Sequence, residues 1–125
     1  MKPSKQLLGQ KGEQQAVDFL KKYHYKIIAR NYRYSRSEID IICCQDDVLI
    51  FCEVKSYQSK PLDAVEFRVN KKKQEKLIQG AYGFIEEYPE YENYNIRFDV
   101  IIVAFSSYPV DITHHKAAFW LEEPF

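Results

Sequence analysis

Residues 37–55 read SEIDIICCQDDVLIFCEVK, and this stretch decides the fold. Two runs rich in Ile, Val, Leu and Phe, residues 37–44 and 48–55, are separated by a short polar segment, which predicts two β-strands joined by a tight turn. If Asp46 and Asp47 form a two-residue turn, the strands pair antiparallel and residues whose numbers sum to 93 lie opposite each other. The stretch therefore predicts a hairpin with a defined register.

This register places charged side chains opposite one another. Asp40 faces Glu53, and Glu38 faces Lys55. Like charges directly opposed across a ladder are destabilising, whereas Mg²⁺ is commonly held by one or two carboxylates together with water and phosphate. Lys55 shares the face of Glu53 by strand alternation, so its ammonium can reach a scissile phosphate. The pattern predicts a metal-dependent site for phosphodiester hydrolysis.

Two structural alternatives remain open for these residues. Asp40 and Glu53 can be carboxylates of ordinary salt bridges within a strand pair. Lys55 can serve as the ion-pair partner of Glu38, a contact that is worth little when exposed. Neither alternative explains why two carboxylates should lie opposite each other.

The rest of the chain supplies the other elements of an α/β fold. Apolar periodicity predicts helices over residues 12–24 and 70–88. Strand-like composition predicts strands over residues 25–34 and 96–105, the latter buried on both faces. The order is a helix, a three-strand antiparallel meander, a crossover helix and a parallel strand. The expected core spans about residues 5–105, and residues 106–125 have no assigned structure.

This topology brings further polar side chains to the same end of the sheet. Glu13 lies on the apolar face of the first helix, where an unpaired carboxylate is costly, and Glu38 starts its strand nearby. Lys73 and Gln74 lie at the start of the second helix. Glu13 can instead be a helix-start carboxylate favoured by the macrodipole, and Lys73 and Gln74 can belong to a solvated basic cluster.

Length and composition favour a single domain. A chain of 125 residues is close to the commonest domain size, so we treat residues 1–125 as one domain. No apolar run approaches the roughly 18 residues of a membrane span, and residues 1–10 lack the apolar stretch of a secretory signal. The three cysteines, without an export signal, favour reduced thiols and a cytoplasmic location.

Charge is distributed unevenly although the formal net charge is zero. Residues 1–76 contain 16 Lys and Arg against 10 Asp and Glu, a net +6, and residues 77–125 contain 2 against 8, a net −6. One face can therefore attract phosphates, or the charges can form an ordinary mixed surface. The first interpretation predicts a DNA-binding surface that contains Arg33, Arg36, Lys71 and Lys72.

Other conspicuous residues have structural interpretations. Arg97 and Asp99 start the last predicted strand at the opposite end of the sheet from the site, so we expect them to be structural. His114 and His115 could bind a metal, but adjacent strand residues point to opposite faces, so we expect them to lie on the surface. Tyrosines of residues 88–94 could stack on bases, but the glutamates among them would repel phosphates.

At this point a family resemblance becomes visible. Asp40 followed by Glu53-Val54-Lys55 resembles the PD-(D/E)xK signature of restriction-endonuclease-like proteins. The chain more closely resembles the bacterial YraN-like family of predicted endonucleases, which is similar to archaeal Holliday-junction resolvases. The blocks that carry the resemblance, over about residues 5–105, are Gly12-Glu13, Asn31-Tyr32-Arg33, Glu38-Ile39-Asp40, Phe51 to Lys55, Lys73-Gln74 and Arg97-Phe98-Asp99. Ser37 stands where that family usually has glycine.

The resemblance implies a three-layer, restriction-endonuclease-like core and a Mg²⁺- or Mn²⁺-dependent endodeoxyribonuclease. It implies that Glu13, Asp40 and Glu53, with Val54, belong to the metal site and that Lys55 is the catalytic lysine. Glu38, Lys73 and Gln74 would be accessory groups. Branched DNA intermediates are the implied substrates, and the resolvase-like relatives suggest a homodimer. The alternative is a catalytically silent module on the same fold that binds nucleic acid or protein.

Overall fold

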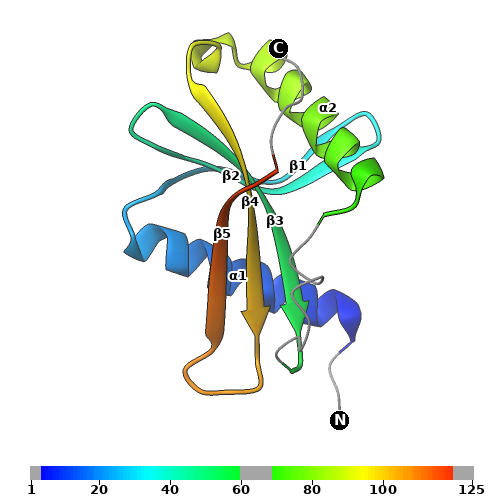
Figure 1. Cartoon of the computed structure of the whole chain (residues 1–125), viewed down its shortest axis with the longest axis vertical. Coiled ribbons are helices and arrows are strands. Elements are labelled where there is room, and N and C mark those ends of the chain that lie inside the picture. The colour runs from blue at the N-terminus through cyan, green and yellow to red at the C-terminus, as the bar shows by residue number, and fades with distance from the viewer. Residues whose placement is uncertain (1–3, 60–68, 120–125) are drawn as a thin grey trace.

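The computed structural model describes residues 4–59 and 69–119 and shows a mixed α/β protein with a five-stranded sheet and two long helices (Figure 1). The elements are α1 (Lys5–Lys22), β1 (Lys26–Tyr34), β2 (Ser37–Gln45), β3 (Val48–Tyr57), α2 (Lys71–Glu87), the short 3₁₀ helix η2 (Pro89–Tyr91), β4 (Asn95–Ala104) and β5 (Asp111–Phe119). The strand order is β1-β2-β3-β4-β5, and all neighbours are antiparallel except β3 and β4. No helix in the described ranges is long and apolar enough to cross a membrane.

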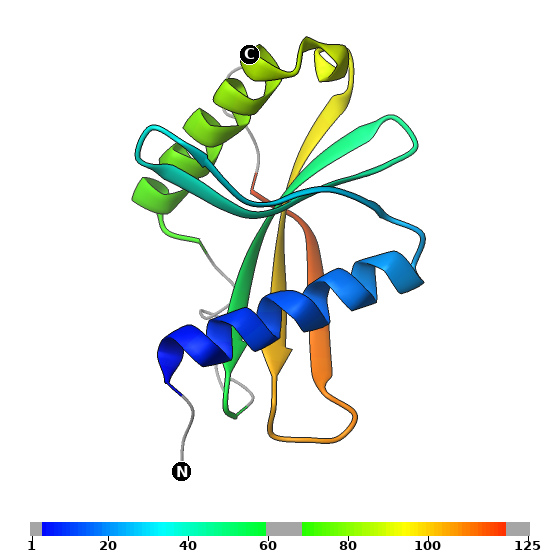
Figure 2. The ribbon, with the colours of Figure 1, turned by 180° about the vertical axis from the view of Figure 1, so that it is seen from behind.

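The helices cover opposite faces of the sheet, which gives three layers (Figure 2). Alternation along β3 divides the core: Phe51 packs with Leu77 and Phe84 of α2, whereas Ile50 and Cys52 pack on the α1 side. The same alternation places Glu53 and Lys55 on the α2 side and Val54 on the α1 side. The predicted α/β class is confirmed, while the restriction-endonuclease-like assignment stays a prediction.

The central hairpin has the predicted register. β2 and β3 pair from Gln45–Val48 to Ile41–Cys52, and every pair sums to 93. The turn consists of Asp46 and Asp47, and Asp46 takes a positive φ of 55°, which aspartate tolerates better than most residues. The two-residue turn thus fixes which side chains of β2 and β3 share a face.

β2 leaves β3 immediately after this ladder. Strict alternation would place Ile39 and Ile41 on one face, yet Ile39 packs in the α2 cluster and Ile41 in the α1 cluster. In the β1–β2 ladder the pairing passes from Arg30–Ile41 to Tyr32–Ile39. Asn31, between them, has a positive φ of 51°. The end of the β1–β2 hairpin therefore turns away from β3 toward α2 (Figure 1), and Asp40 lies where the sheet divides.

The first helix begins earlier than the periodicity indicated. We expected it from residue 12, but α1 begins at Lys5, and the side chain of Ser4 caps it by accepting a hydrogen bond from the Leu7 amide at 3.1 Å. Ser is a preferred residue at this position because it satisfies one free amide of the first turn. The first two turns are largely exposed and polar, so they carry no apolar stripe that would have marked them.

Residues 106–125, to which the sequence analysis assigned no structure, include a strand. β5 pairs antiparallel with β4, so the core extends beyond residue 105, although residues 120–125 lie outside the described part. Its His114 contradicts the expected surface location, because its side chain is 7% exposed and its Nε2 lies 2.7 Å from Asp99 Oδ2. Arg97 donates to both oxygens of Asp99 at 2.9 Å, and the Ala117 amide donates to it at 3.0 Å. Arg97 and Asp99 have structural contacts, as expected, because Asp99 ties β5 to β4 and Arg97 pairs with Asp99.

One glycine sets the distance between α1 and the sheet. A Cβ placed on Gly12 would lie 2.8 Å from Ser56 Cβ, an atom that cannot move without the backbone of β3. Gly12→Ala should therefore lower the free energy of unfolding by about 1–3 kcal/mol through overpacking, measured by urea denaturation. Gly9→Ala is the control, because no neighbouring atom lies within 4 Å of its Cβ. It should be neutral or stabilise α1 by about 0.5–1 kcal/mol; equal losses in both variants would contradict the close approach.

Candidate functional site

Asp40 anchors the site at the division of the sheet. Its Oδ2 accepts a hydrogen bond from the Val54 amide at 2.8 Å, so the side chain replaces the main-chain partner that β2 no longer offers to β3. Burial raises the pKa of the Asp40 carboxyl, whereas the Val54 amide and the charge of Lys73 oppose that rise. The carboxylate is thus held in one position in surroundings that disfavour its charge.

Glu53 is the second partly buried carboxylate and the next residue of β3 after the β2–β3 ladder. Its side chain is 15% exposed. Burial and the charge of Asp40 raise its pKa to about 7, against the attraction of Lys73 and Lys55. The predicted proximity of Asp40 and Glu53 is therefore present, although the two residues follow the ladder and are not paired within it.

Glu13 reaches the site from α1. Burial and then the charge of Asp40 raise its pKa, while Arg30 and a hydrogen bond from the Asn31 side chain lower it. The alternative explanation by the helix macrodipole is wrong. Glu13 is the ninth residue of α1, and the effect is confined to the first turn.

Of the accessory residues expected on α2, Lys73 faces the site. Its Nζ lies 3.6 Å from Glu53 Oε2, an ion pair that is too long for a hydrogen bond. Gln74 instead donates from Nε2 to the Val69 carbonyl at 2.7 Å and so secures the start of α2, where Asn70 accepts from the Lys73 amide. Lys73 is thus a site residue, and Gln74 has a structural contact at the helix start.

The end of the β1–β2 hairpin differs from the prediction. Glu38 lies opposite Arg33 in the β1–β2 ladder and forms an exposed ion pair with it at 3.5 Å. The expected opposition of Glu38 and Lys55 is therefore wrong, because β2 has already separated from β3. Arg33 and Arg36 are exposed at the hairpin end, and Lys71 and Lys72 are exposed in the first turn of α2.

Sequence reasoning gave no role to Asn31. Its positive φ shapes the division of the sheet, and its side chain bonds Glu13. The signal was present, because asparagine tolerates the left-handed conformation better than most residues. The partner, however, is 18 positions away on another element, and the sequence pattern does not reveal that contact.

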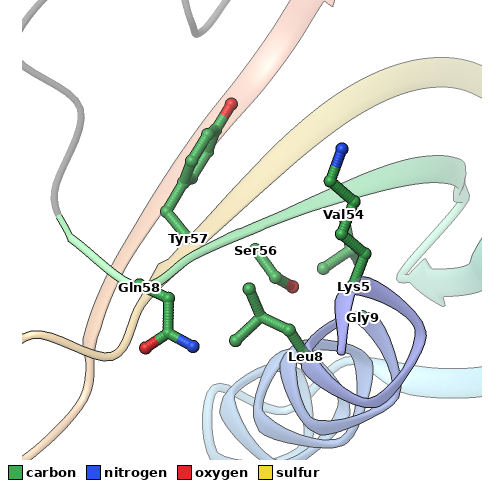
Figure 3. A pocket seen from close by; sticks show the side chains of 7 residues that line it. All are labelled: Lys5, Leu8, Gly9, Val54, Ser56, Tyr57 and Gln58. Carbon is green, nitrogen blue, oxygen red and sulfur yellow. The ribbon is translucent and has the colours of Figure 1, made fainter. Parts of the chain in front are cut away.

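A cleft lies beside the site on the α1 side of β3 (Figure 3). Its volume is about 520 Å³, and it lies between the first turns of α1 and the end of β3. Lys5, Leu8 and Gly9 line it from α1, and Val54 and Ser56 line it from β3. The Ser56 Oγ is buried without a hydrogen-bond partner. The cleft shares Val54 with the site, because Asp40 bonds the amide of that residue.

The side chains of the site could supply part of the ligand shell of a small divalent cation. In residues 4–59 and 69–119 no group of three or more His, Cys, Asp or Glu side chains is arranged to hold a metal ion. Mg²⁺, however, often takes one or two protein carboxylates and completes its shell with water and phosphate. Asp40 and Glu53 supply that pair, and Glu53 Oε2 and Glu13 Oε1 are buried without hydrogen-bond partners. The donor set fits Mg²⁺ or Mn²⁺ better than a metal that needs a closed protein shell.

The raised pKa of Glu53 gives a pH-dependent stability. Its value of about 7 lies above the ordinary 4.5, so the folded state holds this proton more tightly than the unfolded state. Without metal, stability should therefore fall as pH rises from about 4.5 to 7, by roughly 3 kcal/mol from this group.

Urea denaturation in chelator across this pH range tests the effect. Glu53→Gln should remove most of the slope, and Glu75→Gln, at an exposed position of α2, controls for net charge. An unchanged slope in Glu53→Gln would show that the carboxyl is not strained in the folded protein.

Together, the fold and this site define an α/β protein with a partly buried carboxylate pair beside two lysines where its sheet divides. The chain belongs to the uncharacterised protein family UPF0102, whose model matches residues 12–103. This range includes Glu13, Asp40, Glu53, Lys55 and Lys73. The family-level resemblance drawn from the sequence is confirmed, whereas the likeness to PD-(D/E)xK nucleases and resolvases stays a prediction.

Relatives are similar over most of their length. A UPF0102 protein of Natranaerobius thermophilus is 43% identical over 113 residues, which cover 89% of this chain and 95% of the relative. One from Prosthecochloris aestuarii is 39% identical over 126 residues (92% and 94%), and one from Treponema denticola is 36% identical over 122 residues (90% and 94%). The similarity therefore covers nearly the whole chain.

Proposed function

We propose that this protein is a Mg²⁺- or Mn²⁺-dependent endodeoxyribonuclease. One observation carries the proposal. Asp40 and Glu53 are two partly buried carboxylates whose pKa values are both raised, and they are held together beside Lys55 and Lys73. Such a pair costs stability in a protein that does not use it. A divalent cation and a phosphodiester together would balance these charges.

Each residue then has a distinct task. Asp40 and Glu53 would hold the cation, which when bound lowers the pKa of water and stabilises charge on the phosphate. Asp40 is positioned by its bond to the Val54 amide. Glu13 supports the pair from α1. Lys55 would bind a phosphate oxygen or orient the attacking water, and Lys73 holds Glu53 through their ion pair.

The DNA would lie over the exposed basic residues beside this site. Replacing Arg33, Arg36, Lys71 and Lys72 with Gln should weaken DNA binding and flatten its dependence on salt, because each lost phosphate contact removes about 0.9 from the slope of log K against log salt. Fluorescence anisotropy at several salt concentrations measures both. Lys21→Gln/Lys22→Gln, at the end of α1, is the control. Unchanged affinity and slope in the fourfold variant would exclude this surface.

Cleavage of a DNA panel tests the activity itself. Linear duplex, single-stranded, flap and four-way substrates are incubated with Mg²⁺, with Mn²⁺ or with chelator. We expect cleavage with metal, none with chelator, and loss of cleavage in Asp40→Asn. Intact DNA under all conditions would reject the proposal.

The ion pair between Lys73 and Glu53 favours a second candidate. A lysine at 3.6 Å already neutralises part of the carboxylate charge, so the site could be a retained structural feature of a module that binds DNA or protein without cleaving it. Such a module would bind DNA equally well in chelator and in Mg²⁺. The same panel distinguishes the two candidates when binding is measured beside cleavage.

A further inference from the structure

A second pocket lies away from the carboxylate site, between β1 and the C-terminal end of α2. Its volume is about 220 Å³, and it is lined by Ile28, Ala29, Tyr32, Phe84, Tyr88, Glu90 and Tyr91. Phe84 is 1% exposed, and the rings of three tyrosines surround it. Their centroids lie 5.2 Å (Tyr32), 4.9 Å (Tyr88) and 5.5 Å (Tyr91) from that of Phe84.

The surroundings of this pocket are negative. Residues 77–96 contain four glutamates and no Lys, Arg or His. Glu90 lines the pocket, and Glu87 accepts a hydrogen bond from the Tyr32 hydroxyl at 3.2 Å. The last turn of α2 contains no basic residue, so the negative end of its dipole also faces this region without compensation.

Two of the three basic side chains of the neighbouring strand have other partners, and the third, Lys26, does not line the pocket. On β1, Arg30 donates to Gln14 of α1 at 3.1 Å, and Arg33 pairs with Glu38. Neither arginine lines the pocket. The pocket therefore combines aromatic faces, which attract cations, with carboxylates and an uncompensated helix end.

We propose that this pocket binds one arginine side chain projecting from a segment of a partner protein. The planar guanidinium stacks on aromatic faces and pairs with carboxylates better than the compact ammonium of lysine. The volume is below the 300 Å³ or more of typical small-molecule sites, which suits a single side chain. Nucleic acid is a poor occupant because the glutamates would repel its phosphates. A second copy of this chain is also a poor occupant, because it would have to present the basic residues 1–76, which contain the surface proposed for DNA binding.

A peptide with a single arginine tests the proposal. We would titrate the full chain, in chelator and at low salt, with acetyl-Gly-Ser-Arg-Ser-Gly-amide and follow the tyrosine ring resonances by NMR. Shifts should concentrate on Tyr32, Tyr88 and Tyr91. The same peptide with citrulline, a neutral isostere of arginine, should bind several-fold more weakly. Equal binding of both peptides would overturn the proposal.

Matched variants separate the pocket from general charge. Tyr88→Ala should weaken binding about two- to fivefold. Tyr82→Ala should not, because Tyr82 lies within α2 and outside the pocket, at a similar exposure of 43% against 39%. Glu90→Gln should weaken binding, and Glu75→Gln should not. Equal losses within either pair would overturn the proposal. So would ring shifts that follow protein concentration without peptide, since they would identify a second copy as the occupant.

Discussion

Lys55→Ala should lower the rate of DNA cleavage by about 10²- to 10³-fold, the usual cost of removing one preorganised group that stabilises developing charge. Lys55 follows Glu53 by two positions on the same face of β3, and its charge lowers the pKa of Glu53. A protonated lysine cannot be a metal ligand. The variant should therefore keep its affinity for Mg²⁺, and the loss should appear in the single-turnover rate constant at saturating metal.

The matched control for this variant is Lys76→Ala, which removes an exposed lysine of α2 outside the proposed DNA-binding surface. It should cleave at nearly the wild-type rate once DNA is saturating. Thermal melts of both variants exclude a folding defect, and calorimetric titration with Mg²⁺ measures metal affinity. If Lys55→Ala cleaves as fast as wild type, or if it loses metal affinity in proportion to activity, the role given to Lys55 is wrong.

Local patterns were sufficient to predict the centre of the fold. Alternation in residues 37–55 and the short polar segment between the two strands predicted the hairpin and its register, because a two-residue turn leaves one way to pair the strands. The stripe of Leu77, Ala81 and Phe84 predicted α2, which is a strongly amphipathic helix. These features depend on residues close together in the chain.

The elements that the sequence analysis did not predict depend on tertiary contacts. β5 has no clean alternation, and its His114 is buried because Asp99 bonds it from β4. A signal existed, since a strand as apolar as residues 100–104 would be an exposed edge without a neighbour on its far side. That argument predicts a partner strand for β4 but does not say which residues form it.

The candidate site was predictable as a set of residues but not as a geometry. The register placed Asp40 beside Glu53, and the topology brought Lys73 toward them. The division of the sheet at Asp40 was not predictable, because it depends on Asn31 and on the packing of Ile39 against α2. For that reason Glu38 pairs with Arg33 and the expected pairing with Lys55 is absent from the ladder.

Asp40→Asn should abolish cleavage and, in chelator, should leave the protein at least as stable as wild type. Burial raises the pKa of Asp40 above its ordinary 3.8, so at neutral pH the folded state bears the cost of holding it charged. Asparagine keeps the shape and an oxygen that can accept from the Val54 amide. Removing the charge should stabilise the metal-free protein by about 1 kcal/mol. This gain should disappear below about pH 4, where the Asp40 carboxyl of wild type is protonated in both the folded and the unfolded state.

Metal should reverse the order of stability, so that wild type becomes more stable than Asp40→Asn. A cation that binds the folded state alone stabilises it by an amount that grows with its concentration, by about 2.7 kcal/mol at 100 times the dissociation constant. Millimolar Mg²⁺ or Mn²⁺ should therefore raise the melting temperature of wild type much more than that of Asp40→Asn. A structural carboxylate predicts the opposite pattern, in which the variant is less stable in chelator and neither protein responds to metal. Thermal melts of both proteins with chelator and with metal distinguish these cases, because a destabilised, metal-indifferent variant would reject Asp40 as a ligand.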